Sequence, residues 1–331
     1  MTEPEGSQGE QAPSERAPRG VPLLVDCDPG IDDAVALLLA CASPEVRLLG
    51  VTTVSGNVGV GHTTRNARRV LALAGRHDVP VARGAGRPLV RAQPREAREV
   101  HGDDGVHGAP LPEPTAPLDP RHAVDLLAGT IRAEPEPVTL VAVGPLTNVA
   151  LLYAMHPEEA SRLHRLVVMG GAADGGNVTP RAEFNVWADP DAAYRVLTEP
   201  GLPRPVPTTL VTMDVTMAVP LTEADLDRLG AGGPAGRAAR AMLEPAFAHY
   251  EASYGTRTVA VHDAVAVAEM VRPGLLTLAP ATVVVDRSDG PGRGATTVDL
   301  AAVAPGLTVS VGADANALVE LVVGRVATYR S

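Results

Sequence analysis

Four aspartates lie within eight residues near the start of the chain. They are Asp26, Asp28, Asp32 and Asp33, in the string DCDPGIDD. Carboxylates this crowded repel one another, and burying them without a partner is costly. One interpretation is that one or two of them cap a helix, whose N-terminus favours negative charge, while the rest face water. The other is that a cation balances them, and all-oxygen ligation indicates a hard ion, Ca²⁺ or Mg²⁺.

The residues on either side predict the elements that position these carboxylates. We expect a short buried strand over 21–25, a turn at Pro29-Gly30 and a buried helix over 34–42. Because both flanking elements are apolar, the acids should be enclosed, which favours the metal site over exposed caps. Cys27 and Cys41 lie in these two elements and are expected to be reduced core residues.

Two further stretches carry polar side chains of use to a binding site. The loop GNVTPRAEFNVWADP contains Asn177, Glu183 and Asn185, which can donate and accept hydrogen bonds to a polyhydroxylated ligand. Its composition is equally typical of a solvated loop. His262 and Asp263 begin an expected helix, where such a pair alone is more typical of a helix cap beside a surface histidine.

Expected strands and helices alternate along the first two thirds of the chain. The strands lie at 46–54, 138–143 and 166–169, and the helices at 62–74, 122–133, 146–154 and 190–197. This alternation predicts one α/β domain with a mostly parallel, Rossmann-like central sheet covered by helices. Ligands bind at the carboxyl ends of strands in such sheets, so the acidic turn, Asn57, the Val143-Gly144 corner and the loop after Met169 should converge.

The C-terminal third of the chain is less regular. The expected elements are a strand at 210–214, a helical stretch over 221–250, a helix from 262, strands at 281–286, 296–300 and 307–311, and a helix over 314–323. The closely spaced late strands suggest a small antiparallel addition. Residues 1–20 are polar and rich in Pro, Gly and Glu, which predicts a disordered tail before a single domain over 21–331.

Composition restricts the classes of function. The 331-residue chain has a net charge of −11, which argues against nucleic-acid and membrane partners, because both select basic surfaces. No apolar run reaches the roughly 18 residues of a membrane helix, and no signal peptide is evident, so we expect a cytoplasmic protein. Histidine and cysteine spacings do not fit zinc, and neither a phosphate-binding loop nor a nucleophilic serine motif is present.

The whole string D-x-D-P-G-x-D-D-A resembles the metal-binding signature of the inosine–uridine-preferring nucleoside hydrolases. The turn GPLTN at 144–148, the motif HG-x-x-G from His101, the 176–190 loop and the His-Asp pair at 262–263 are also similar to the family's motifs, in family order. The resemblance covers nearly all of the chain from about residue 22. His107 departs from the small residue that is usual at its position, which puts the shape of that loop in doubt.

The resemblance implies an enzyme that hydrolyses the N-glycosidic bond of ribonucleosides to free base and ribose. It implies Ca²⁺ ligands at Asp28, Asp33 and Asp263 and at the backbone carbonyl of Val143, where the family often has threonine. Valine can serve there because the side chain is not the ligand. Asp32 would be the general base that takes a proton from water.

The resemblance also assigns the groups that would hold the substrate. The ribose would be bound by Asn57, Asn177, Glu183 and Asn185, His262 would protonate or stabilise the departing base, and His101 would face that base or be exposed in its loop. The helical spacing of Tyr250 and Tyr254 indicates either base contacts or half-buried anchors. A role in purine or pyrimidine salvage and a homodimer or homotetramer are implied as well. The preference for purine or pyrimidine stays open.

Two other functions use similar residues. Haloacid-dehalogenase-like phosphatases also place D-x-D after a first strand, with Mg²⁺, and Asp26 would then be the nucleophile and Asp28 the acid. Their pattern is D-x-D-x-T, which Gly30 and Ile31 do not fit. The second alternative is a non-catalytic nucleoside-binding protein of the same fold, which the intact acidic signature does not favour.

Overall fold

The computed structural model of the protein describes residues 20–92, 96–302, 304 and 306–330, so residues 1–19 of the predicted tail lie outside it. Its centre is an eight-stranded sheet in the order β3-β2-β1-β4-β5-β6-β12-β9, parallel except for the edge strand β9. The strands are β1 (Val21–Cys27), β2 (Val46–Thr53), β3 (Val81–Arg83), β4 (Thr139–Ala142), β5 (Arg165–Met169), β6 (Thr208–Val211), β9 (Leu276–Pro280) and β12 (Leu307–Ala313). The predicted single α/β domain with a mostly parallel sheet is confirmed.

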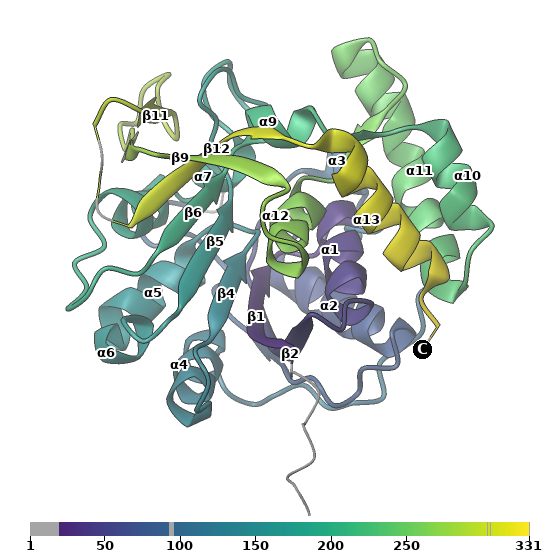
Figure 1. Cartoon of the computed structure of the whole chain (residues 1–331), viewed down its shortest axis with the longest axis horizontal. Coiled ribbons are helices and arrows are strands. Elements are labelled where there is room, and N and C mark those ends of the chain that lie inside the picture. Colours follow the sequence, from purple (N-terminus) through teal and green to yellow (C-terminus); the bar gives the residue numbers. More distant parts are fainter. Residues whose placement is uncertain (1–19, 93–95, 303, 305, 331) are drawn as a thin grey trace, which may run out of the picture.

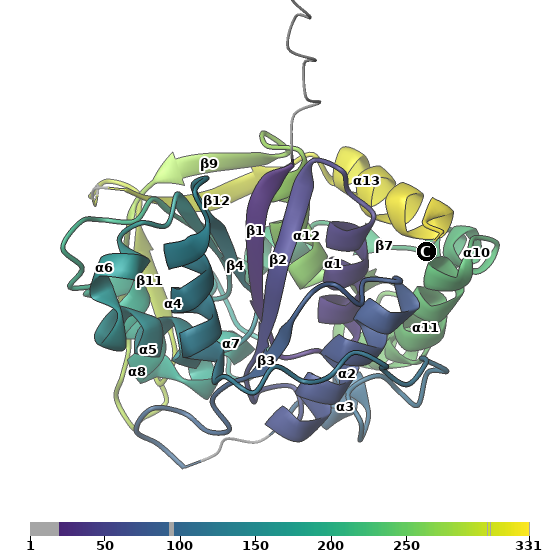
Figure 2. The same ribbon diagram turned by 90° about the horizontal axis from the view of Figure 1, so that it is seen from below.

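Helices cover both faces of this sheet (Figures 1 and 2). One face carries α4 (Ala123–Ala133), α5 (Thr147–Met155), α6 (Pro157–Ala160) and α8 (Pro190–Ala193), which is followed by a π-helical turn at Tyr194–Thr198. The other carries α1 (Ile31–Cys41), α2 (Val60–Leu73), α12 (His262–Val271) and α13 (Ala315–Thr328), with α10 (Glu223–Gly230) and α11 (Pro234–Tyr254) beyond them. Each face has its own apolar core, which fixes the sheet between two packed layers.

The central position of β1 and α1 follows from their sequence. Residues 22–27 of β1 are all buried, as expected of a strand that pairs in parallel with β2 on one side and β4 on the other. Helix α1 is buried from Ile31 to Ala40, because it packs against β2 of the sheet and is surrounded by α2, α11, α12 and α13. The acidic turn joins these two elements and is therefore enclosed by the core.

Two predicted elements of the C-terminal third were wrong in their extent. The strand predicted over 210–214 ends at Val211, and α9 (Met213–Met217) begins two residues later. The helical stretch predicted over 221–250 is two helices after the short strand β7 (Pro220–Leu221), because Gly232 and Gly233 precede Pro234. Proline lacks the N–H that would continue a helix but suits the first helical position, so a new helix starts there.

The small antiparallel addition has fewer strands than the sequence suggested. Strands β10 (Thr282–Val285) and β11 (Thr296–Asp299) pair antiparallel as a separate hairpin. The third late strand, β12, instead joins the main sheet between β6 and β9. The other two-stranded pair is β7 with β8 (Val259–Ala260), directly before α12.

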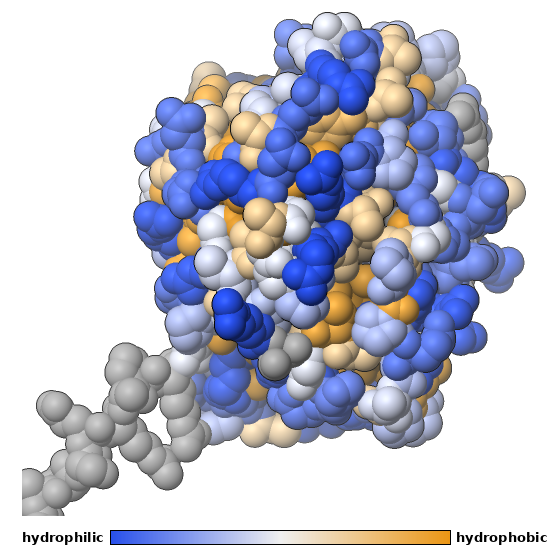
Figure 3. Space-filling view, turned by 90° about the vertical axis from the view of Figure 1, so that its right-hand side faces the viewer, coloured by the Kyte–Doolittle hydropathy of each residue, from blue (hydrophilic) through white to orange (hydrophobic). Residues whose placement is uncertain are grey.

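The outer surface is mixed in polarity. Figure 3 shows the face that lies at the right of Figure 1, where hydrophilic residues cover most of the surface and hydrophobic residues lie between them. Within the described residues, no helix has both the length and the apolar character that crossing a bilayer requires.

Candidate active site

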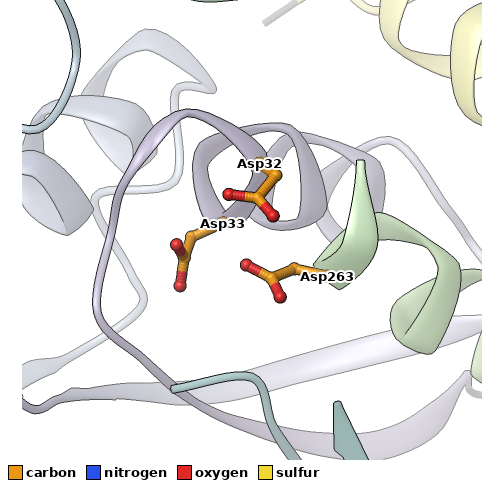
Figure 4. Close-up of side chains that lie close together, drawn as sticks. All are labelled: Asp32, Asp33 and Asp263. Carbon is orange, nitrogen blue, oxygen red and sulfur yellow. The ribbon is translucent and has the colours of Figure 1, made fainter. Parts of the chain in front are cut away.

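Three buried carboxylates from two helices meet at the carboxyl end of the sheet. Asp32 and Asp33 lie in the first turn of α1, and Asp263 lies in the first turn of α12. One carboxylate oxygen of each residue lies within 4.8 Å of the corresponding oxygens of the other two. Figure 4 shows the three carboxylates turned toward a common centre. Residues 230 positions apart in the sequence therefore form one acidic cluster, which could hold a metal ion.

Backbone N–H groups fix the turn between β1 and α1. Asp33 accepts hydrogen bonds through Oδ1 from the N–H of Asp28 and through Oδ2 from the N–H of Gly30, both at 3.0 Å. It is thus a cap of α1 as well as a member of the acidic cluster, so both interpretations of the sequence hold for this residue. Asn57 donates from Nδ2 to the same Oδ2 at 3.1 Å and ties the end of β2 to the turn.

Asp28 lies beside the cluster but outside the group of three. Its Oδ2 accepts from the N–H of Asn57 at 2.7 Å, whereas its buried Oδ1 has no hydrogen-bond partner. Two glycines make room for this side chain. A Cβ at Gly56 would lie 2.0 Å from Oδ2, and one at Gly144 would lie 2.6 Å from Oδ1. The turns after β2 and β4 must therefore carry glycine to let the Asp28 carboxylate fit between them.

Burial and mutual repulsion make these acids hard to ionise. Burial, followed by the neighbouring Asp33 carboxylate, raises the pKa of Asp32 to about 8. The same two causes raise the pKa of Asp28 well above its ordinary value, and burial with the Asp32 and Asp33 charges does so for Asp263. Oδ1 of Asp32 is also buried without a partner. Unpaired carboxylate oxygens around one point are the donor set that a hard divalent cation requires.

The acidic cluster opens onto a cavity of about 410 Å³. As the sequence predicted, the acidic turn, the ends of β2 and β4 and the loop after β5 converge there. The groups that line the cavity include Asp32, Asn57, His101, Val143, Met169, Asn177, Glu183, Asn185, Trp187, Tyr250, Tyr254, His262 and Asp263. Among its described lining residues there is no lysine or arginine, so nothing there would neutralise a phosphate.

The loop after β5 brings three predicted residues to the cavity. Glu183 caps the short helix α7 (Phe184–Ala188) and accepts from the N–H groups of Gly171, Asn185 and Val186 at 2.8 to 3.2 Å. Burial raises the pKa of Glu183 to about 7. Asn185 donates from Nδ2 to the carbonyl of Val143 at 2.8 Å, so the loop is joined directly to the end of β4.

Asn177 takes a different place from its two partners in this loop. It is exposed, and its Oδ1 accepts from the N–H of Phe184 at 2.9 Å. Its Nδ2 is not used in that contact. Asn177 therefore lies at the rim of the cavity, while Glu183 and Asn185 lie at its floor.

His262 sits between two hydroxyl groups. Its Nδ1 lies 2.6 Å from Oγ1 of Thr216, and its Nε2 lies 3.1 Å from the phenolic oxygen of Tyr250. Thr216 also donates to the carbonyl of Met213 at 3.0 Å. The two contacts of the imidazole hold its ring between α9 (Met213–Met217) and α11. Burial lowers the pKa of His262 to about 4.

His101 presents a hydrogen-bond donor to the cavity. Its Nδ1 accepts from the backbone N–H of Ile31 at 3.1 Å, so the ring proton is on Nε2. The imidazole is buried at the end of α3 (Arg98–His101), and burial lowers its pKa to about 3. His107 has φ +50°, a backbone conformation that favours small residues, and its Nε2 contacts the carbonyl of Val100 at 2.8 Å. The contact between His107 and Val100 fixes the shape of the loop that follows α3.

Several residues of the site have no counterpart in the sequence-based prediction. Asn148 donates from Nδ2 to Oδ1 of Asp26 at 2.8 Å and accepts from the N–H of Ala85, and Thr52 donates to the same Oδ1 at 2.5 Å. Asn148 belongs to the GPLTN turn, so that motif could have identified it. Trp187 lies in the 176–190 loop, so that motif could have identified it as well, whereas Thr216 carries no such signal because it is one ordinary residue brought to the site by the fold.

Comparisons with known proteins agree over nearly the whole chain. The sequence profile of the family "Inosine-uridine preferring nucleoside hydrolase" matches residues 23–320. A pyrimidine-specific ribonucleoside hydrolase, RihA of Citrobacter koseri, is 40% identical over 94% of this chain and 99% of its own. Two solved structures are similar at TM-scores of 0.86 and 0.85. They are a plant nucleoside hydrolase (30% identity; 94% of this chain, 99% of that one) and a purine-preferring ribonucleoside hydrolase from Gardnerella vaginalis (29% identity; 92% and 98%).

Proposed function

We propose that this chain, which belongs to the inosine-uridine preferring nucleoside hydrolase family, depends on Ca²⁺ for its reaction. Membership of the family makes it an N-ribosyl hydrolase, and the proposed reaction is the hydrolysis of ribonucleosides to free base and ribose. The observation that carries this proposal is the buried cluster of Asp32, Asp33 and Asp263 at the floor of a cavity rich in amides and hydroxyls. The absence of cationic groups among the described lining residues disfavours the phosphatase alternative, and family membership disfavours a purely binding role.

The donor set supports a calcium site. Asp28, Asp33, Asp263 and the carbonyl of Val143 would hold the ion, and the unpaired Oδ1 of Asp28 is a ready ligand. When bound, Ca²⁺ lowers the pKa of a water molecule and orients sugar hydroxyls. Asn57 holds Asp28 and Asp33 through three hydrogen bonds, so it positions the ligands as well as facing the sugar.

Asp32 is suited to act as the general base. Its Oδ1 has no hydrogen-bond partner, and the residue lines the cavity beside the proposed ligands Asp33 and Asp263. As the bond between C1′ and the base nitrogen breaks with its electron pair on the base, a water oxygen bonds to C1′ and gives a proton to Asp32. The surrounding carboxylates stabilise the positive charge that develops on the sugar.

The sugar and the departing base would be held on opposite sides of this centre. Asn177, Glu183 and Asn185 are the proposed ribose contacts, because a carboxylate and amides can pair with several hydroxyls. The base then faces His101 and the pair formed by Tyr250 and His262. The proton that the base needs to leave would come through that pair.

We propose pyrimidine ribonucleosides as the preferred substrates. This rests on the 40% identity to a pyrimidine-specific relative, against 29% to a purine-preferring one. Uracil and cytosine carry a carbonyl next to the nitrogen that bonds the sugar, and the Nε2–H of His101 is a donor suited to it.

The test is to incubate the purified protein with uridine, cytidine, inosine and guanosine and to measure released base. We expect kcat/KM for the pyrimidine nucleosides to exceed that for the purine nucleosides about tenfold or more, because only the pyrimidines would accept the hydrogen bond from His101. No base release from any nucleoside would overturn the proposed reaction. Faster purine release would overturn only the base preference, and hydrolysis of p-nitrophenyl phosphate with Mg²⁺ would support the phosphatase instead.

A further inference from the structure

The hairpin β10–β11 has no part in the chemistry above, yet its C-terminal half runs along the loop that carries the proposed ribose contacts. We propose that residues 293–296, here called the brace, position this loop, and that Thr296 is the positioning residue for Glu183. The inference rests on the proposed function, because it takes Glu183 to contact the sugar. The contacts of the brace are independent of one another and fall at three points of the loop.

The first point is Ala172, at the start of the loop. Thr296 Oγ1 accepts from the N–H of Ala172 at 2.9 Å and donates to the carbonyl of the same residue at 2.6 Å. Both partners are buried. Gly171, the preceding residue, has φ +65° and donates its N–H to Glu183 Oε2 at 2.8 Å. The Thr296 hydroxyl therefore fixes the backbone of Ala172, and the preceding residue, Gly171, donates the N–H that holds the Glu183 carboxylate.

The second and third points lie on either side of Glu183. Ala295 forms an antiparallel bridge with Ala182. Beyond the carboxylate, Arg293 donates to the carbonyl of Trp187 at 3.2 Å, and its guanidinium lies 4.7 Å from the centroid of the indole ring. Gly294 packs so closely there that a Cβ would lie 2.5 Å from Cα of Trp187. The loop is thus held at Ala172, at Ala182 and at Trp187, before and after Glu183.

The other support of the loop's start comes from α9. Asp214 accepts from the N–H groups of Ala173 and Asp174 at 2.6 and 2.9 Å. Met213 donates its N–H to the carbonyl of Gly171. Helix α9 and the hairpin therefore hold residues 171–174 from two sides. Loss of the Thr296 hydroxyl should loosen this segment without unfolding the domain, because α9 still holds it.

The test compares Thr296→Val, which keeps the shape but removes the hydroxyl, with Thr296→Ser, which keeps the hydroxyl. Thr297→Val is the matched control, because Thr297 is an exposed neighbour on the same strand. We expect Thr296→Val to lower kcat/KM for a ribonucleoside about tenfold, mainly through KM, since a buried hydrogen bond contributes on that order. Thr296→Ser and Thr297→Val should stay within about twofold of the unchanged protein.

Two readouts separate a positioning role from general destabilisation. In a double-mutant cycle, the effect of Thr296→Val should largely disappear in the Glu183→Gln background, because both changes act on one contact. Amide hydrogen exchange over residues 171–187 should be faster in Thr296→Val than in Thr297→Val, with or without substrate. Equal exchange and equal KM in these two variants would overturn the inference. Absence of base release by the unchanged protein would count only against the proposed function, since hydrogen exchange still decides the positioning role.

Discussion

The phenolic oxygen of Tyr250 lies 3.1 Å from Nε2 of His262. Tyr250 comes from α11 and His262 from the first turn of α12, so the contact links two helices at the wall of the cavity. Because Thr216 occupies Nδ1 on the far side of the ring, the orientation of the imidazole is fixed. This geometry presents a phenol and an imidazole together to a departing base.

Removal of the phenolic hydroxyl tests this pair. We expect Tyr250→Phe to lower kcat for uridine about tenfold or more, because general acid catalysis contributes at least that much to a poor leaving group. Hydrolysis of p-nitrophenyl riboside, whose leaving group departs without a proton, should change little. His262→Ala should show the same selective loss. Equal losses on both substrates would mean that the pair shapes the pocket instead of assisting departure.

Asp32 should be essential for turnover but not for folding. Asp32→Asn keeps the shape and removes the proton acceptor, so we expect kcat to fall about a hundredfold or more. The variant should melt at the same temperature as the unchanged protein or higher in metal-free buffer, because one of three mutually repelling buried carboxylates is gone. Asp227→Asn, at an exposed position of α10, is the control for loss of a charge. Near-normal rates in Asp32→Asn would refute its role as base.

Metal removal should lower both activity and stability. Without a cation the carboxylates of Asp33 and Asp263 face each other in a buried site, so exhaustive chelation is expected to lower the melting temperature, and Ca²⁺ to restore it. Asp263→Asn should show a smaller response to chelation and to Ca²⁺, whereas Asp227→Asn should respond like the unchanged protein. Full activity and unchanged melting after chelation would contradict the metal site, and recovery with Mg²⁺ alone would contradict the choice of Ca²⁺.

Buried His101 should make stability depend on acid pH. Burial lowers its pKa from 6.5 to about 3, with small contributions from His107, His262 and His249. Between these two values the unfolded chain binds a proton that the folded protein does not. The free energy of unfolding should therefore rise with pH from about 3 to about 6.5, by up to about 1.4 kcal/mol per pH unit from this residue.

Denaturant unfolding of His101→Asn at several pH values checks this dependence. Asparagine can still accept from the N–H of Ile31 but does not titrate, so the variant should lose less stability than the unchanged protein on going from pH 6.5 to 4.5. His62→Asn, which removes an exposed histidine of α2, separates the effect of this site from the loss of any histidine. Parallel stability curves for His101→Asn and the unchanged protein would show that His101 is not held neutral by burial.

Much of the fold could be predicted because its signals are local. The strand, turn and helix around the acidic residues follow from two apolar runs separated by Pro29-Gly30, and the alternation of elements indicates a parallel sheet. Local signals failed for strands whose place is decided by the strands with which they pair. Strand β12 has the same short apolar pattern as β10, and only its pairing with β6 and β9 puts it in the main sheet. Strand β9 escaped prediction because it pairs only at one edge.

The sequence by itself determined which residues could do chemistry. The spacing of Asp28, Asp32 and Asp33 and the identity of Asp263 are chemical facts of the chain, and they supply carboxylates that could hold a metal ion. Only the tertiary structure brings Asp263, which the family resemblance had named as a ligand, within reach of Asp32 and Asp33. It also decided that the Thr216 hydroxyl orients His262 and that a distant hairpin holds the loop of Glu183. Such contacts join residues tens to hundreds of positions apart, and no local propensity encodes them because they exist only once both packed layers have closed on the sheet.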